Sequence, residues 1–477
     1  MKHTIKARCR ALCLSLALLS PAHADQLPLL GDSSSGIVSL DEEHQLGNAW
    51  VRTLRAQAPL LDDPVTYSFI KTLLQRLSVY SALSDRRLTL VVINNNNLNA
   101  FAVPGGIIGV NSGLFLFSAT EGEFASVLAH ELSHLSQRHY AQRLAEEQKN
   151  LPLQLATTLA GILLMATTDN QAGMATIMGG QAAAVERSLA FSRSNEQEAD
   201  RIGMQVLADT GYDPAAMPRM FSQLQRSSAN LGRKPPEFLL THPVTESRIA
   251  DALNRSSQLS TNGTVNSLSY QIIRTRAQVL ALNNNSAAYL KYSDAVAADP
   301  SVANRYGLAF SALRSRHLPQ AQQQLNLLLE QAPDRLNFQL LQAELWLVAG
   351  HPERASQQLQ QLLELYPGNH PITMLLAKAY HQQGAQQQVV DLLQQHSRAY
   401  PDDIQLWYQL AEANGLINDI TGVHLARSEY FLLIGAVVKA KQHLQLALKQ
   451  PDISEHQRAL IEQRLKDTEQ IRKSLER

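Results

Sequence analysis

Prolines recur in the C-terminal half of the chain at a spacing that strongly constrains its fold. Pro300, Pro333, Pro367 and Pro401 are separated by 33, 34 and 34 residues. The stretches between them are rich in Gln, Leu and Ala, which are good helix formers. A period of this length is typical of a helix pair that buries its apolar face only against neighbouring pairs. The sequence from about residue 269 onward therefore predicts an all-α solenoid.

Several other positions keep the same period, which is that of the tetratricopeptide repeat. Small residues recur where two helices must come close, and an aromatic residue and a glycine recur in the first helix and at the turn. The small residues are Ala288, Ala321, Ala355 and Val389, together with Ala309, Ala343 and Ala377. The aromatic residues are Trp346 and Tyr380, and the glycines are Gly350 and Gly384. Beyond Pro401 the register slips, and the next matching proline is Pro451. We therefore expect a partner-binding repeat domain over residues 269–477 with irregular last helices.

The first 24 residues have the features of a secretory signal peptide. A basic start within residues 2–10 precedes an apolar run over 11–20, and Ala22-His23-Ala24 matches a small-x-small cleavage site. The alternative is an uncleaved membrane anchor, but the apolar run is shorter than the ~18–20 residues that span a bilayer. Residues 25–39, with their Gly, Ser and Asp, are expected to form a flexible arm.

The positions of the cysteines and the net charge limit which cellular compartment and which classes of partner the sequence predicts. Both cysteines, Cys9 and Cys13, lie within the expected signal peptide, so the mature chain has no disulfide, thiol nucleophile or cysteine ligand. The 42 basic and 42 acidic residues cancel, which gives no electrostatic reason to expect nucleic acid as a partner. We expect a cysteine-free exported protein of the bacterial periplasm.

The segment His130-Glu131-Leu132-Ser133-His134 reads H-E-x-x-H within a stretch of helical periodicity. Positions i and i+4 share one helix face, so the two histidines can bind one ion. Glu131 is then placed to reach a water on that ion. Thr120 and Glu123 form a capping box that begins this helix.

A later helix supplies the rest of a metal centre. Glu196 and Asp200 have the E-x-x-x-D spacing, so Glu196 can be the third ligand while Asp200 hydrogen-bonds a ligand histidine. Glu198 is the alternative ligand, but no aspartate follows it at the same spacing. Two imidazoles and one carboxylate leave a fourth position for water, which predicts one catalytic zinc ion per chain.

The predicted chemistry is hydrolysis of a peptide bond. Glu131 is expected to take a proton from water and pass it to the leaving amine. His242 and Arg248, in the pattern His-Pro-x-x-x-x-x-Arg, are the candidates for stabilising the oxyanion. An alternative is that His242 fills the fourth zinc position and keeps the site latent. His139 lies five residues past His134 and off its helical face, so a structural or supporting role is expected.

Two further segments bear on substrate access. The sequence predicts short strands over 87–94, 98–103 and 107–111, and an exposed edge within 98–111 could hold an extended peptide as an added strand. Residues 151–185 are nearly uncharged but too interrupted to span a bilayer. A buried helical hairpin, a cover over the site and a surface for peripheral membrane contact are the alternatives there.

The motifs together resemble the gluzincin family of HtpX and the CAAX prenyl proteases. They are Asn99–Gly106, H-E-L-S-H, Ser192–Asp200 and His242-Pro243 with Arg248, within residues 40–255. The resemblance implies that His130, His134 and Glu196 bind zinc and that Glu131 is the catalytic base. Exported relatives with tetratricopeptide repeats imply a role in outer-membrane protein quality control. Unfolded or misassembled outer-membrane proteins would be the clients, and the barrel-assembly machinery would be a partner through the repeats.

We therefore expect an α+β chain in which a mostly helical zinc-metallopeptidase domain with a small β-sheet covers residues 40–255. A linker over 256–268 leads to the all-α tetratricopeptide domain over 269–477. The main alternative is a periplasmic chaperone or scaffold with a latent protease site. A membrane-associated peptidase that matures lipoproteins is a third interpretation, and it depends on bilayer binding through 151–185.

Overall fold

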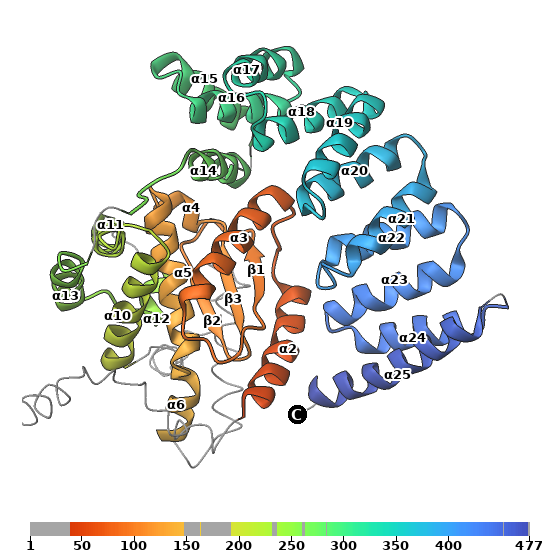
Figure 1. The fold of residues 1–477 in the computed structure, drawn as a ribbon, viewed down its shortest axis with the longest axis horizontal. Helices are drawn as coiled ribbons and strands as arrows, with labels where there is room; N and C mark the ends of the chain where they lie inside the picture. Colours follow the sequence, from red (N-terminus) through yellow and green to blue (C-terminus); the bar gives the residue numbers. More distant parts are fainter. Residues whose placement is uncertain are drawn as a thin grey trace, which may run out of the picture.

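The fold comes from a computed structural model that describes residues 39–146, 163, 192–230, 236–259, 263–282, 284–451 and 453–475. The expected signal peptide, most of the arm and nearly all of 151–185 lie outside these residues. An N-terminal α+β unit is followed by helix pairs that arch along one side of it (Figure 1). The structure thus confirms the predicted fold class.

The N-terminal unit places helices around a small sheet. Its helices are α2 (Leu40–Gln57), α3 (Pro64–Tyr80), α4 (Leu114–Phe117), α5 (Glu121–Ser136), α6 (His139–Glu146), α10 (Arg193–Asp209), α11 (Ala216–Asn230), α12 (Glu237–Thr241) and α13 (Glu246–Ser256). Two of them, α5 and α10, are the helices that the sequence predicted for the H-E-x-x-H motif and for Glu196 and Asp200.

The sheet has three strands, β1 (Thr89–Ile93), β2 (Ala100–Val103) and β3 (Ile107–Asn111), in the order β1-β3-β2. β1 is parallel to β3, and β2 is antiparallel to it. The turn between β2 and β3 requires glycine, because Gly105 and Gly106 have φ of 87° and 83°. β2 is an edge strand among the described residues, and it packs against α5.

The helix pairs of the solenoid follow the predicted period. They are α14 (Leu268–Ala281), α15 (Asn285–Ala298), α16 (Val302–Arg314), α17 (Leu318–Gln331), α18 (Leu336–Ala349), α19 (Pro352–Leu365), α20 (His370–Gln382), α21 (Gln386–Ser397), α22 (Ile404–Leu416), α23 (Ile420–Leu433), α24 (Val437–Leu448) and α25 (Glu455–Leu475). Gly350 and Gly384 lie at the expected turns with φ of 81° and 76°, where a side chain would be strained. Ala343 and Ala377 are fully buried, as close helix packing requires.

The hydrophobic core runs from the N-terminal unit into the solenoid without a break. One cluster of buried side chains includes Leu74 of α3, Leu128 of α5, Ala343 of α18 and Leu376 of α20. At the far end of the arch, α25 and α23 contact α2 (Figure 1). The solenoid is therefore packed against the N-terminal unit rather than tethered to it.

A buried ion cluster joins the two parts. Arg276 of α14 places Nη2 2.6 Å from Asp63 Oδ1 and 2.7 Å from Glu344 Oε1 of α18, and its Nη1 donates to the Tyr306 hydroxyl at 3.2 Å. Asp63 is also the N-cap of α3 and accepts from the Thr66 amide at 3.0 Å. A single arginine therefore supports the start of a helix in the other part of the molecule.

Stacked rings make a second contact between the parts. Lys71 of α3 lies 3.9 Å from the centroid of the Tyr400 ring, which stacks on His370 and His396. His370 Nε2 is in turn 3.1 Å from Asp403 Oδ2. A cavity of about 310 Å³, lined by both parts, lies beside these rings.

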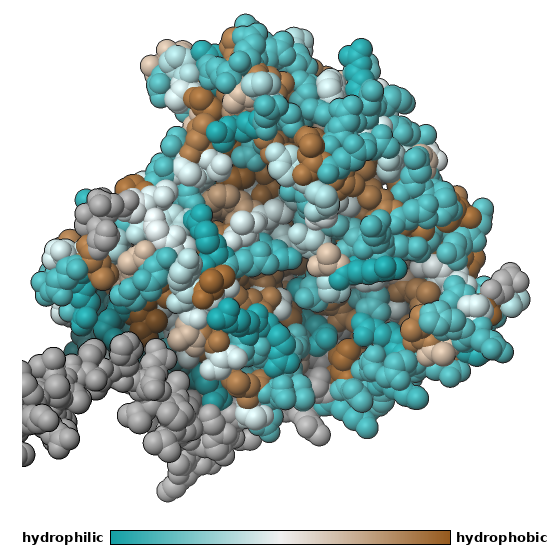
Figure 2. All heavy atoms as spheres, viewed as in Figure 1, coloured by the Kyte–Doolittle hydropathy of each residue, from teal (hydrophilic) through white to brown (hydrophobic). Residues whose placement is uncertain are grey.

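On the face shown in Figure 2, hydrophilic residues cover most of the solenoid, and hydrophobic residues show both scattered among them and between the solenoid and the N-terminal unit. Within the described part of the chain, none of the helices is both apolar enough and long enough to cross a membrane.

Candidate metal centre

Helix α5 carries the H-E-x-x-H residues in the middle of the core. The predicted capping box begins it, because the Thr120 side chain accepts from the Glu123 amide and the Glu123 carboxylate accepts from the Thr120 amide. Almost every residue of the helix is buried, including His130, Glu131 and His134. The polar groups of the site are therefore held by a rigid, desolvated element.

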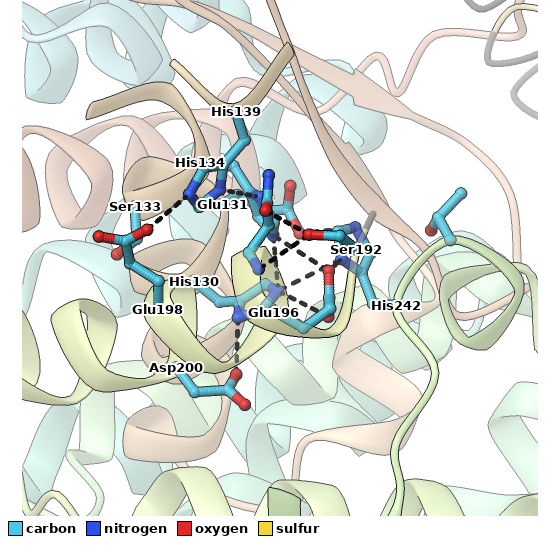
Figure 3. Close-up of polar contacts among 12 residues, drawn as sticks. His130, Glu131, Ser133, His134, His139, Ser192, Glu196, Glu198, Asp200 and His242 are labelled. Carbon is cyan, nitrogen blue, oxygen red and sulfur yellow. Dashed lines mark hydrogen bonds and ion pairs between the residues drawn. The ribbon is translucent and has the colours of Figure 1, made fainter. Parts of the chain in front are cut away.

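Helix α10 packs more extensively on α5 than on any other described element, and it brings Glu196 to the histidines. Gly203 permits this approach, because a Cβ atom there would lie 3.1 Å from the backbone nitrogen of His130. Glu196 Oε1 lies 3.4 Å from His134 Nε2, and Glu196 Oε2 lies 3.7 Å from His130 Nε2. The two helices thus direct three potential ligands toward one point, as Figure 3 shows.

His242, at the C-terminal end of α12, completes a group of four. Its Nδ1 lies 2.9 Å from Glu196 Oε1 and 3.3 Å from His130 Nε2. Its Nε2 lies 3.5 Å from Glu131 Oε1. The ring of Phe238, one helical turn earlier, packs on His242 with centroids 4.8 Å apart. His242 therefore faces the same point as the three predicted ligands.

The four residues fit a metal ion. One ligand atom from each of His130, His134, Glu196 and His242 lies within 4.8 Å of the other three. The Nε2 atoms of His130 and His134 are 3.0 Å apart, close to the roughly 3.3 Å that tetrahedral zinc with bonds of about 2.0–2.1 Å requires. Three imidazoles and one carboxylate suit zinc, although other first-row metals accept the same donors.

Glu131 is the fifth buried group at this point. Neither of its carboxylate oxygens has a hydrogen-bond partner among the described residues. A buried carboxylate without such partners is costly, and a bound water beside a cation would relieve it. The buried Glu131 carboxylate, with His242 Nε2 3.5 Å from its Oε1, therefore fits a hydrated metal centre.

Asp200 and Arg248 each contact one of the four clustered residues. Asp200 Oδ1 lies 3.0 Å from His130 Nδ1, on the side of the ring away from the cluster. Arg248 of α13 forms a two-pronged ion pair with Asp200, with both N–O distances 2.7 Å, and its Nη1 lies 2.6 Å from Glu196 Oε2. The predicted place of Asp200 agrees with this geometry. The Arg248 guanidinium contacts carboxylates of α10, and its role at the oxyanion stays a prediction.

Electrostatics within the protein favour the metal-binding protonation states of His134 and Glu196. Burial lowers the pKa of His134 well below its ordinary value, which leaves a neutral ring with a free lone pair. Burial by itself would raise the pKa of Glu196, but the charge of His242 and hydrogen bonds from His134 and His242 lower it well below the ordinary range. Burial raises the pKa of Glu131, against the opposing charges of His242 and His130. For His242, burial lowers the pKa but the charges of Glu196 and Glu131 raise it overall, which favours the protonated ring.

His139 is a supporting residue whose place the sequence left open. Its Nδ1 lies 2.8 Å from His134 Nδ1, and its Nε2 lies 3.4 Å from Glu198 Oε2 (Figure 3). Glu198 thus contacts His139 while Glu196 faces the cluster.

Of residues 151–185, only Leu163 is described, and it packs against the hydrophobic cluster that includes Trp50. The alternatives for that segment therefore stay predictions.

A buried group in which two histidines of an H-E-x-x-H helix meet a glutamate of α10 and a histidine at the end of α12 is the kind of centre that metallopeptidases have. Comparisons with known proteins agree. Residues 66–256 match peptidase family M48, and residues 347–413 match a tetratricopeptide repeat.

Related proteins match half or more of this chain. A beta-barrel assembly-enhancing protease of Yersinia pestis is 38% identical over 325 residues, 67% of this chain and 66% of that protein. Its Escherichia coli K12 counterpart is 42% identical over 52% of this chain and 51% of its own length. A putative one from Vibrio cholerae is 34% identical over 68% of both chains. A solved tetratricopeptide repeat protein from Parabacteroides merdae covers 57% of this chain and 98% of its own, at 14% identity and a TM-score of 0.27.

The chain therefore belongs to the family of beta-barrel assembly-enhancing proteases, M48 metallopeptidases that carry tetratricopeptide repeats. It matches about half to two thirds of the length of these relatives.

Proposed function

We propose that this protein is a zinc-dependent endopeptidase of the bacterial cell envelope that cleaves unfolded or misassembled outer-membrane proteins. The observation that carries the proposal is the buried group of His130, His134, Glu196 and His242 beside the buried Glu131 carboxylate. The names of the relatives support the client class and the envelope location. A periplasmic location also rests on the expected signal peptide over 1–24.

In this proposal His130, His134 and Glu196 hold the ion, and Glu131 moves the proton. A bound zinc ion would polarise the scissile carbonyl and make a water more acidic. Glu131 takes a proton from water as the water oxygen bonds to the carbonyl carbon, and it gives the proton to the leaving amine as the C–N bond breaks. The raised pKa of Glu131 suits a group that must both accept and donate. Asp200 and Arg248 keep His130 and Glu196 in place.

The edge of β2 is the proposed place for the substrate backbone. β2 has no strand beyond it among the described residues and lies against the helix that carries Glu131. Its four residues are buried, so the edge has to be uncovered before a substrate can add to it. An extended peptide can add to such an edge through main-chain hydrogen bonds, which read little sequence. Chains that have not folded are extended and accessible, so this geometry favours them over folded proteins. The solenoid is the proposed contact for the barrel-assembly machinery.

Removing the metal tests the proposal. Treatment of the full chain with a zinc chelator is expected to abolish cleavage of an unfolded outer-membrane protein, and stoichiometric Zn²⁺ is expected to restore it. Mg²⁺ is the matched control, since it prefers oxygen ligands and should not restore cleavage. Fragment yield on gels and metal content by elemental analysis are the measurements. Cleavage that persists in metal-free protein would rule the proposal out.

A second candidate function, a chaperone or scaffold with a latent protease site, is favoured by one observation. His242 Nδ1 lies among the ligand atoms, where it occupies the position that a catalytic water needs. In that state the protein would bind clients through its solenoid and cleave only after His242 moves away.

Replacing His242 by leucine distinguishes an active endopeptidase from a chaperone or scaffold with a latent protease site. If His242 closes the site, H242L is expected to cleave an unfolded client faster than wild type, because the fourth position becomes open to water. H370L, which removes a buried histidine of the solenoid, is the control and should leave the cleavage rate unchanged. A slower H242L would instead identify His242 as a group that stabilises the oxyanion. The measurement is the initial rate of client cleavage at equal zinc content.

A further inference from the structure

The two ligand histidines of α5 are supported by different kinds of residue. His130 has the carboxylate of Asp200 3.0 Å from its Nδ1. His134 has the imidazole of His139 beside it, with His139 Nδ1 2.8 Å from its Nδ1. The His139 ring is fully buried, so it cannot exchange this contact for one with bulk water.

A left-handed residue brings His139 to this position. Helix α5 ends at Ser136, and Arg138 follows with φ of 51°, an unfavourable conformation for a side chain with a Cβ. An ion pair between Arg138 Nη2 and Glu43 Oε1, 2.9 Å long, fixes this turn against α2. The next helix then begins at His139 with its ring facing back toward His134. On an unbroken helix, the two rings would lie on different faces.

The arrangement of nitrogen atoms determines where each proton lies. His134 directs Nε2 at the cluster, 3.0 Å from His130 Nε2. When Nε2 is a ligand, the ring proton must lie on Nδ1 and be donated to His139 Nδ1. His139 must then carry its own proton on Nε2, which faces Glu198 Oε2 at 3.4 Å. Glu198 has a side chain that is 40% exposed, so this chain of contacts ends at the protein surface.

We propose that His139 is a positioning residue that fixes the tautomer and ring orientation of His134, and that Glu198 holds His139 in turn. This inference rests on the proposed metal centre and assigns the support of its second histidine. Supporting hydrogen bonds of this kind typically change metal affinity by about 10–100-fold.

The test measures zinc affinity, which does not depend on proteolysis. Metal-free full-length wild type, H139L and H139N are titrated with Zn²⁺ against a fluorescent chelator at one pH. Leucine and asparagine are similar in size, but only asparagine offers an oxygen that can accept the His134 proton. We expect H139L to bind Zn²⁺ about 10–100-fold more weakly and H139N to bind close to wild type. H396L, at a buried solenoid histidine, should match wild type, and E198A should give a smaller loss than H139L.

Equal zinc affinity in H139L and wild type would overturn the inference. If wild type binds one zinc ion but cleaves nothing, the proposed function fails while the inference stands. If H139L keeps wild-type affinity and cleavage, only the inference fails. A second measurement needs no variant: ring ¹⁵N spectra of zinc-loaded wild type should show His139 with its proton on Nε2. A proton on Nδ1 would overturn the inference even if H139L does not fold.

Discussion

Replacement of Glu131 by glutamine is expected to lower the rate of peptide hydrolysis by about 10²–10⁴-fold, the usual contribution of a general base. Glutamine has nearly the same shape but cannot accept a proton from water at neutral pH. Glu131 is not among the four clustered ligand residues, so E131Q should bind zinc as wild type does. Initial rates of client cleavage, with zinc content measured on the same samples, give the result.

The control for Glu131 is Glu123, a buried glutamate on the same helix that caps its start and lies away from the cluster. E123Q should keep most of the activity, because glutamine can still accept the capping hydrogen bonds. An E131Q protein that holds zinc and cleaves at the wild-type rate would refute the role of Glu131.

The largest expected effect on stability comes from replacing Arg276 by methionine. The change leaves the carboxylates of Asp63 and Glu344 buried without their cation. Breaking a buried ion pair in this way typically lowers the free energy of unfolding by about 3–5 kcal/mol. Chemical denaturation of the full chain at neutral pH is the measurement.

Arg87 offers a matched control for this change. Its side chain is 50% exposed and it pairs with Asp85, so solvent screens the pair and R87M should lower the free energy of unfolding far less than R276M does. Adding E344Q to R276M removes one uncompensated charge and should recover part of the loss. A loss in R276M no larger than that in R87M would show that the cluster does not join the two parts energetically.

Local patterns predicted much of the site. His130, Glu131 and His134 share a motif that contains its own helical spacing, and the spacing of Glu196 and Asp200 places both on one face of α10. The three strands and the helix pairs also follow from period and turn residues. Each of these features depends on residues that are close in sequence, where backbone geometry alone decides which side chains meet.

The features that the sequence did not predict depend on contacts between distant residues. His139 reaches His134 only because Arg138 adopts a left-handed conformation next to Glu43. Arg248 contacts Asp200 and Glu196 because α13 packs against α10. Repeat periodicity shows which solenoid faces are apolar, but not that part of that surface continues the core of the N-terminal unit.

Because the solenoid shares a hydrophobic core with the N-terminal unit, it cannot readily be replaced by repeats from another protein. Cutting the chain after residue 268 would uncover apolar side chains of α3 and remove the cation at the start of that helix. A chimera carrying repeats from another protein would meet the same mismatch unless it also reproduced the Arg276 cluster. Surfaces for new partners are therefore more easily acquired by substitutions on the outer face of the existing repeats than by replacing the repeats themselves.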